Sequence, residues 1–457
     1  MENKSAYEIK ITKDKMKALL SFETAEAAVT AEEIMGELQK LGVRNGILKD
    51  KLESILQNRH VYTDYVIAEG LEPTEPFPGK VEYFFETVKD MKPSVDKDGN
   101  VDYKNLSLIS NVKQGQILAK LEPAVQGEPG INILGIPLPP PQVKPVMIKA
   151  GKNTAFNDTK TELFATKNGM VMLQDGAVMV NDVYQVPNHV GPSTGNITFA
   201  GNVIVSGNVL DDFMVTADGD IEVFGVVEGA ILKAGGNIVL HSGISGKGRA
   251  VLEAEGNLMT KYIEQSTVKI RGDIHASAIL HSTIRCGGSV IVEGKKALIS
   301  GGRIVSGSYV ETNILGSHMG TVTEIEVGVN PVISEEYEEM KKDLPKIKNE
   351  LEQMEKIITL LNKKREIEGG LEESKQEMYA TAIKNKIVLS TRYQKMEKDF
   401  QKMEEEMNIG TAGEIRVNGI LYSGTRLTIS NVNRIITDDV RSVKFVREGA
   451  DLKMISI

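Results

Sequence analysis

The chain has 457 residues, a formal net charge of −9 and an apolar content of 41%. That apolar fraction supports a buried core, which excludes an intrinsically disordered chain, and the length allows two to four domains. Lys and Arg form no block or stripe interleaved with aromatic residues, so binding to nucleic acid is disfavoured.

The sequence indicates a cytoplasmic protein. Cys286 is the single cysteine and cannot form an intramolecular disulfide, which fits a reducing compartment. The N-terminus MENKSAYEIKITKDK lacks the apolar core of a signal peptide. There is no run of about 18 apolar residues, so we expect no insertion into a membrane.

The N-terminal residues predict a small α+β unit. YEIKI (7–11) and KALLSF (17–22) have the pattern of strands. Thr30 begins a helix, because Glu33 follows three positions later as in a capping box, and Gly42 ends it. LKDKLESILQN predicts a second helix. From Val61 to about Pro192, short extended segments separated by Gly and Pro predict small barrels or meanders. PLPPPQVKP is expected to be a stiff strap, with a polyproline ligand for an SH3-type module as the alternative.

A repeat follows in the middle of the chain. A Gly, then Asn, Asp or Ser, then an apolar or Tyr residue recurs from Gly201, and the steps are 18, 17, 20, 16, 16 and 19 residues. Such self-similarity is typical of a solenoid, and the alternating residues between the repeats predict about three short strands per coil. We therefore expect a right-handed parallel β-helix of about seven coils, roughly 30–35 Å long.

The repeat suggests roles for its two first residues. Gly would permit a turn conformation that other residues resist, and Asn or Asp would cap that turn with its own side chain. A ligand-binding ladder formed by this column is the alternative. The column contains Asn202, Asp220, Asn237, Asn257, Asp273, Ser289 and Ser308.

A charged helical hairpin is predicted from Ser334 to Met407. Its first apolar seam contains Leu344, Ile347, Leu351, Met354, Ile358 and Leu361, and its second contains Leu389, Tyr393, Met396, Phe400, Met403 and Met407. Spacing in threes and fours is coiled-coil spacing, and Gly369-Gly370 marks the reversal of an antiparallel pair. Pro345 should kink the first helix or reset its start.

The predicted fold is mainly β, with the N-terminal α+β domain, the β-helix and the inserted coiled coil as separate parts. The strands after Gly410 should pack on the last coil and cover its open edge. The expected domains are an α+β domain at 1–115, small β units and the strap at 116–192, the β-helix at 193–331, the hairpin at 332–410 and C-terminal strands at 411–457.

Three histidines of the repeat, His241, His275 and His281, are candidate metal ligands. Some acyltransferases and one class of carbonic anhydrase place histidines on β-helices, but they have a strict six-residue repeat. Here that spacing occurs only at Gly195, Gly201 and Gly207. We therefore expect surface or turn histidines, with a three-histidine zinc site as the alternative.

Two further segments have competing interpretations. Asp211, Asp212, Asp218 and Asp220 could form a sugar or Ca²⁺ site, although turn-capping and solvated carboxylates explain them more simply. SGISGKGR (242–249) resembles a phosphate-binding loop only loosely, because it lacks the GK[ST] ending and a following helix. We assign no catalytic, cofactor-binding or metal-binding residues.

The layout resembles the bacterial flagellar assembly protein A family over essentially the whole chain. The most specific pieces are LISNVKQGQILAKLEPAVQGEPGINILG and the turn AEGLEP, centred on Gly70. After that turn the family usually has a second Gly-Asp turn, whereas this sequence has TEPFPGK. The resemblance implies a scaffold or regulator in cell-pole and flagellar organisation, with a β-helix similar to that of bactofilin-type polymers. It supplies no catalytic residues.

These observations predict a non-enzymatic cytoplasmic scaffold that binds a protein partner through its N-terminal domain, with no cofactor. The sequence leaves open whether the protein forms a homo-oligomer. The alternative is a carbohydrate-active or carbohydrate-binding β-helix protein, which would show a groove with convergent carboxylates and Arg or aromatic side chains.

Overall fold

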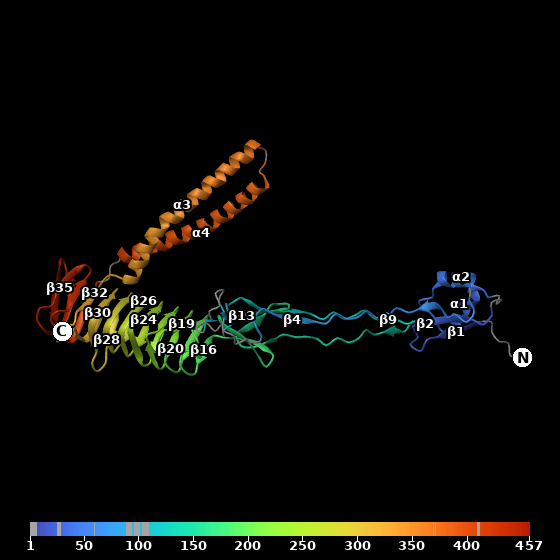
Figure 1. Cartoon of the computed structure of the whole chain (residues 1–457), viewed down its shortest axis with the longest axis horizontal. Coiled ribbons are helices and arrows are strands. Elements are labelled where there is room, and N and C mark those ends of the chain that lie inside the picture. The colour runs from blue at the N-terminus through green and yellow to red at the C-terminus, as the bar shows by residue number, and fades with distance from the viewer. Residues whose placement is uncertain are drawn as a thin grey trace. The chain divides into compact units, whose positions relative to one another are not determined.

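A computed structural model describes residues 7–24, 29–58, 60–87, 94–95, 101–102, 109–368, 370, 372–408 and 412–457. The chain divides into two compact units (Figure 1, coloured from blue at the N-terminus to red at the C-terminus). The first contains Met1–Thr87, Gln114–Thr166 and Leu173–Met179. The second contains Val88–Lys113, Lys167–Met172 and Val180–Ile457.

The first unit begins with an antiparallel sheet and two helices. The sheet has the order β1 (Tyr7–Ile11), β2 (Lys17–Phe22), β3 (Tyr65–Glu69), and its helices are α1 (Ala31–Lys40) and α2 (Lys49–Gln57). Apolar residues of both layers form one buried cluster: Leu20, Ile34, Leu38, Leu52 and Ile67. The predicted strands and the capping box between Thr30 and Glu33 are confirmed.

Short strands follow, as the Gly- and Pro-punctuated sequence predicts. One sheet has the order β12 (Thr154–Phe156), β13 (Glu162–Ala165), β8 (Ile117–Glu122), β4 (Lys80–Tyr83). The other short pairs are β9 (Gly130–Ile131) with β10 (Pro137–Leu138), β11 (Lys149–Ala150) with β15 (Ala177–Asn181), β7 (Asn111–Val112) with β14 (Gly169–Gln174), and β5 (Ser94–Val95) with β6 (Val101–Asp102).

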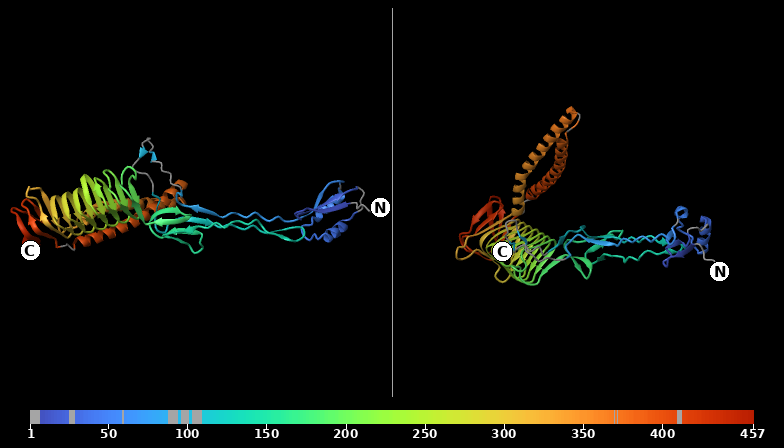
Figure 2. Two further views of the ribbon diagram at one scale, coloured as in Figure 1. Left: turned by 90° about the horizontal axis from the view of Figure 1, so that it is seen from below. Right: turned by 45° about the vertical axis from the view of Figure 1, so that its right-hand side comes forward.

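The second unit contains a parallel β-solenoid of about eight turns, which confirms the predicted fold class (Figure 2). Its first column contains β16 (Val183–Val186), β18 (Asn202–Val205), β20 (Ile221–Val223), β23 (Ile238–Leu240), β25 (Leu258–Thr260), β27 (Ile274–Ala276), β29 (Val290–Val292), β31 (Tyr309–Leu315) and β33 (Glu414–Leu421).

Two more columns complete each coil. The second contains β17 (Ile197–Phe199), β19 (Met214–Ala217), β22 (Ile231–Ala234), the second part of β24 (Gly243–Ala254), the second parts of β26 (Tyr262–Ile270), β28 (Ala278–Cys286) and β30 (Leu298–Ser306), then β32 (Thr323–Val327) and β34 (Arg426–Ile429). The third contains β21 (Val226–Glu228) and the first parts of β24, β26, β28 and β30.

The solenoid interior consists of apolar residues stacked in register. In the first column, Val203, Ile221, Ile238, Leu258 and Ile274 follow one another from coil to coil, and each is fully buried. Because side chains alternate across a strand, the residues between them lie on the outer surface.

The repeated Asn and Asp residues bind the next coil, so the prediction that they cap their own turn is wrong. Their Oδ1 atoms accept hydrogen bonds of 2.6 to 2.9 Å from the backbone N–H one coil later. The acceptors are Asn202, Asp220, Asn237, Asn257 and Asp273, and the donors are Asp220, Asn237, Asn257, Asp273 and Ser289. We call this arrangement the amide ladder. It supports the structural interpretation of the column.

The repeated glycines leave space for the Oδ1 atoms of the amide ladder. None of Gly219, Gly236, Gly256, Gly272 and Gly288 has a positive φ, so the prediction of a special turn conformation is also wrong. Instead, a Cβ added at each of them would overlap the Oδ1 atom of the ladder residue in the preceding coil. Glycine is therefore required by the close approach of that side chain.

The hairpin consists of α3 (Pro331–Glu368) and α4 (Glu373–Asn408). The pairs Tyr337–Phe400 and Glu355–Lys386 join the two helices in antiparallel order. The predicted seams are buried or half-buried except for Met407, which is exposed. α3 continues through Pro345, so the helix does not restart there.

The chain after the hairpin closes the solenoid. β33 and β34 first add parallel strands to β31 and β32. Then β36 (Val440–Glu448) pairs antiparallel with β33, β37 (Asp451–Ser456) with β36, and β35 (Val432–Ile435) with β34. Antiparallel strands end the parallel stack and cover its edge. Of the helices that the structure describes, none is both long and apolar enough to cross a membrane.

Candidate functional site

The three candidate histidines of the solenoid do not converge. His275 lies in β27 and is in register with Met259 and Ile291 of the adjacent coils. His241 follows β23 and its Nε2 is 2.7 Å from Oε1 of Glu222. His281 belongs to another column, in β28. Among the described residues, no group of three or more His, Cys, Asp or Glu side chains could hold a metal ion.

The predicted acidic cluster takes part in local contacts. Arg249 forms ion pairs with both Asp211 and Asp212. Asp220 belongs to the amide ladder, where it accepts the N–H of Asn237 at 2.6 Å. These contacts agree with the structural interpretation of the carboxylates.

The segment 242–249 is part of β24 and the chain leading into it, rather than a loop before a helix. Lys247 and Gly248 have φ values of 50° and 75°, so the chain makes a local turn there. The Lys247 ammonium lies 3.2 Å from the Glu228 carboxylate. This lysine is therefore already paired.

Cys286 lies in the solenoid core. Its burial raises the pKa of the thiol to about 12. A thiol with such a pKa stays protonated at neutral pH and is a poor nucleophile.

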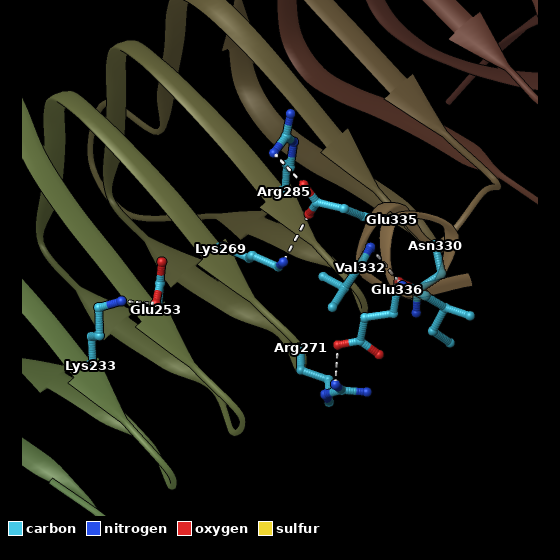
Figure 3. A network of polar contacts seen from close by, with 10 residues as sticks. Lys233, Glu253, Lys269, Arg271, Arg285, Asn330, Val332, Glu335 and Glu336 are labelled. Carbon is cyan, nitrogen blue, oxygen red and sulfur yellow. Dashed lines mark hydrogen bonds and ion pairs between the residues drawn. The ribbon is translucent and has the colours of Figure 1, made fainter. Parts of the chain in front are cut away.

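The most elaborate polar site is the junction between α3 and the solenoid (Figure 3). Oδ1 of Asn330 accepts the N–H groups of Val332 and Ile333 at 3.0 and 3.1 Å, which caps α3. Pro331 occupies the first helical position, where its missing N–H costs nothing. Val332 is buried beside the cap. The helix therefore starts at a fixed point on the solenoid wall.

Three solenoid cations hold the first turns of α3. The Glu335 carboxylate lies 2.8 Å from Nζ of Lys269 and 3.4 Å from the Arg285 guanidinium, and these two cations are in register on β26 and β28. Arg271 pairs with Glu336. We call these five residues the hairpin junction.

The pKa of Glu335 is lowered, chiefly by its hydrogen bond to Lys269 and against the opposing effect of burial. Its side chain is 37% exposed, so each ion pair contributes only about 0.2–1 kcal/mol. The junction therefore fixes the direction of the hairpin base more than it adds to global stability.

Replacing Lys269 by methionine should loosen the base of α3. Loss of one partly exposed ion pair should raise the rate of hydrogen exchange of the α3 amides at 333–340 about two- to fivefold. Because the Glu335 pKa is lowered by folding, the pair stabilises the junction above the ordinary glutamate pKa and loses this effect as the pH falls through the lowered value.

The matched control is Lys233→Met, which removes a 2.8 Å pair with Glu253 on the same outer stripe, away from α3. It should leave exchange at 333–340 unchanged. Equal effects of both substitutions would contradict the assignment, and so would a Lys269 effect that grows as the pH falls below the ordinary glutamate pKa.

Two open grooves lie near the C-terminal coils. One of about 300 Å³ is lined mainly by Arg303, Arg426, Arg434, Glu324 and Glu326. Both its carboxylates are already paired, Glu326 with Arg303 at 2.8 Å and Glu324 with Arg426 at 3.0 Å. The other, of about 440 Å³, is lined by Ser308, Tyr309, Glu311, Ala412, Glu414 and Arg416.

Sequence reasoning missed the hairpin junction. It assigned Glu335 and Glu336 only to the charged helical hairpin, and nothing in the local pattern links them to cations about 65 residues earlier. The one available signal was the Asn330-Pro331 pair, which is typical of a helix start.

Fold and site together define a β-solenoid protein with an anchored helical hairpin. A family model described as the Flagellar Assembly Protein A beta solenoid domain matches residues 182–452, and one described as the Flagellar Assembly Protein A N-terminal region matches residues 7–176. The chain belongs to the flagellar assembly protein A family, which confirms the resemblance and suggests a role in flagellar assembly. No curated protein and no solved structure matches it.

Proposed function

We propose that the protein is a non-enzymatic cytoplasmic scaffold in flagellar assembly. The solenoid is its rigid body, the hairpin is a projecting arm, and the N-terminal domain (1–115) binds a protein partner. The hairpin junction is the observation that carries this proposal. A helix pair that needed only to fold would not require a cap and three cations on the solenoid wall to fix its base.

The contacts of the candidate chemical groups support a non-enzymatic role. The carboxylates of the arginine-lined groove are each paired with an arginine. A general acid or base must instead be free to exchange a proton with a substrate. The carbohydrate-active alternative would need these pairs to open.

The test is complementation of a flagellated bacterium from which this gene is deleted. His241→Gln, His275→Gln and the double variant Glu324→Gln/Glu326→Gln should each restore motility to the wild-type level, because we assign these residues no chemistry. Removal of a catalytic acid or base would instead lower a reaction rate about 100-fold or more.

Immunoblotting shows whether each variant is abundant, and thermal unfolding shows whether it is folded. A variant that is folded and abundant but does not restore motility would contradict the non-enzymatic role. Recovery of the same proteins with each variant in a pull-down supports scaffolding.

A further inference from the structure

The N-terminal sheet has one covered edge and one open edge. Beside β3, the Leu48 N–H donates to the Ile67 carbonyl and the Glu69 N–H donates to the Gly46 carbonyl, both at 2.9 Å. The other edge is β1, and among the residues that the structure describes only those of β2 pair with it (Figure 1). An open sheet edge is a template for another strand.

The backbone groups at the open edge belong to Tyr7, Ile9 and Ile11. The Thr12 N–H donates to the Lys17 carbonyl at 2.9 Å, so Thr12 and Lys17 form a hydrogen-bonded pair. Hydrogen-bonded and non-hydrogen-bonded pairs alternate along an antiparallel ladder, and the register between β1 and β2 is continuous. Tyr7, Ile9 and Ile11 therefore direct their N–H and C=O groups away from the sheet, while the other two residues of β1 face β2.

Strand β1 lacks the features that usually keep a further strand away. Its sequence YEIKI contains no proline, and its pairing with β2 contains no bulge. Tyr7, Ile9 and Ile11 pack against the core formed with α1 and α2 but are only half-buried. Glu8 and Lys10 are exposed, and their side chains form an ion pair of 2.8 Å. A lone lysine would protect the edge, whereas this pair is neutral.

The strand is complementary to itself when two copies run antiparallel about Ile9. Ile9 then lies opposite Ile9 of the second copy, and Tyr7 lies opposite Ile11, so residues with outward backbone groups meet one another. These pairs would exchange about six hydrogen bonds. Glu8 lies opposite Lys10, twice by symmetry, in the pairs whose side chains approach most closely.

Charge selects this register among those that the backbone allows. A pairing centred on Glu8 or on Lys10 would also match the outward backbone groups, but it would put Glu8 opposite Glu8 or Lys10 opposite Lys10. Like charges directly opposite each other destabilise a sheet, whereas opposite charges stabilise it. The chain itself therefore supplies the strand that fits this edge, which makes a second copy the expected occupant.

We propose that two copies of the chain associate through β1, in an antiparallel pairing centred on Ile9. The two three-stranded sheets then form one continuous sheet in the order β3-β2-β1-β1-β2-β3. A contact of this small size is typical of a weak, reversible dimer. The inference goes beyond the proposed scaffold function, because a dimer presents two hairpins and two partner-binding domains in one particle.

Sedimentation velocity of the full chain, from about 1 to about 100 µM, measures this association. We expect a reversible equilibrium between monomer and dimer. Glu8→Lys and Lys10→Glu should each raise the dissociation constant about tenfold or more, because each puts like charges opposite one another at two places. An equimolar mixture of the two variants should dimerise again, and so should the double variant Glu8→Lys/Lys10→Glu, since opposite charges then face each other.

The matched control is Glu69→Lys, which makes the same charge change opposite Lys17 at the covered edge, where the two side chains form a 3.0 Å pair. It should leave the dissociation constant unchanged, and circular dichroism verifies that every variant is folded. A wild-type monomer at the highest concentration, equal effects of Glu8→Lys and Glu69→Lys, or no recovery in the mixture would overturn the proposal. Complementation judges the scaffold role separately, so a monomeric protein that restores motility would refute the dimer alone.

Discussion

Replacing Gly219 by alanine should destabilise the solenoid by about 1–3 kcal/mol, through overpacking and loss of a hydrogen bond between coils. A Cβ at this position would overlap Oδ1 of Asn202, the atom that accepts the N–H of Asp220 at 2.8 Å. Either the side chain moves and the hydrogen bond breaks, or the two coils separate. Thermal unfolding of the β signal by circular dichroism measures the loss.

The Asn202→Ala background separates the steric cause from a backbone effect. In this background, Gly219→Ala should lower the free energy of unfolding much less. The remaining close neighbour is the Gly201 carbonyl oxygen, which lies 3.1 Å from the added Cβ and needs to shift only slightly. Gly36→Ala in α1 is the control, since nothing lies within 4 Å of its Cβ, and it should stabilise by about 0.5–1 kcal/mol. Equal costs of the Gly219 change in both backgrounds would contradict the amide ladder.

Replacing residues 329–412 by a short Gly-Ser linker should leave the solenoid folded and abolish motility. The entry and exit of the hairpin meet, because a Cβ at Gly328 would lie 3.4 Å from Cα of Gly413. The pairing of β33 with β31 and of β34 with β32 does not depend on the helices. The ion pairs lost at the junction are partly exposed and contribute little.

Circular dichroism measures the outcome of this replacement. The helical signal should fall, while a cooperative β transition persists at nearly the wild-type temperature. Loss of that transition would show that the hairpin is part of the solenoid core. Restored motility by a folded, hairpin-free chain would contradict the scaffold role of the arm.

The sequence predicted well what depends on local pattern. The strands at 7–11 and 17–22, the capping box of Thr30 and the seam from Leu344 to Leu361 follow from periodicity and from side chains within a few residues of one another. The coil repeat was recognised for the same reason, since Gly and Asn or Asp recur at nearly constant steps.

The parts that were missed depend on contacts between distant residues. The role of Gly219 depends on a side chain 17 residues earlier, and Glu335 meets Lys269 across 66 residues. The antiparallel pairing of Phe77 with Val125 was missed because the prolines around both residues have the pattern of a loop. Only the register between the two strands brings these residues together.

The amide ladder has a direction that bears on how the chain is made. In all five steps the acceptor belongs to the earlier coil and the donor to the later one. A ribosome synthesises the earlier coil first, so each emerging coil finds its acceptor already in place. Each coil of a nascent chain can therefore fold against a completed coil. The last parallel strands, β33 and β34, can pair only after the hairpin has been synthesised.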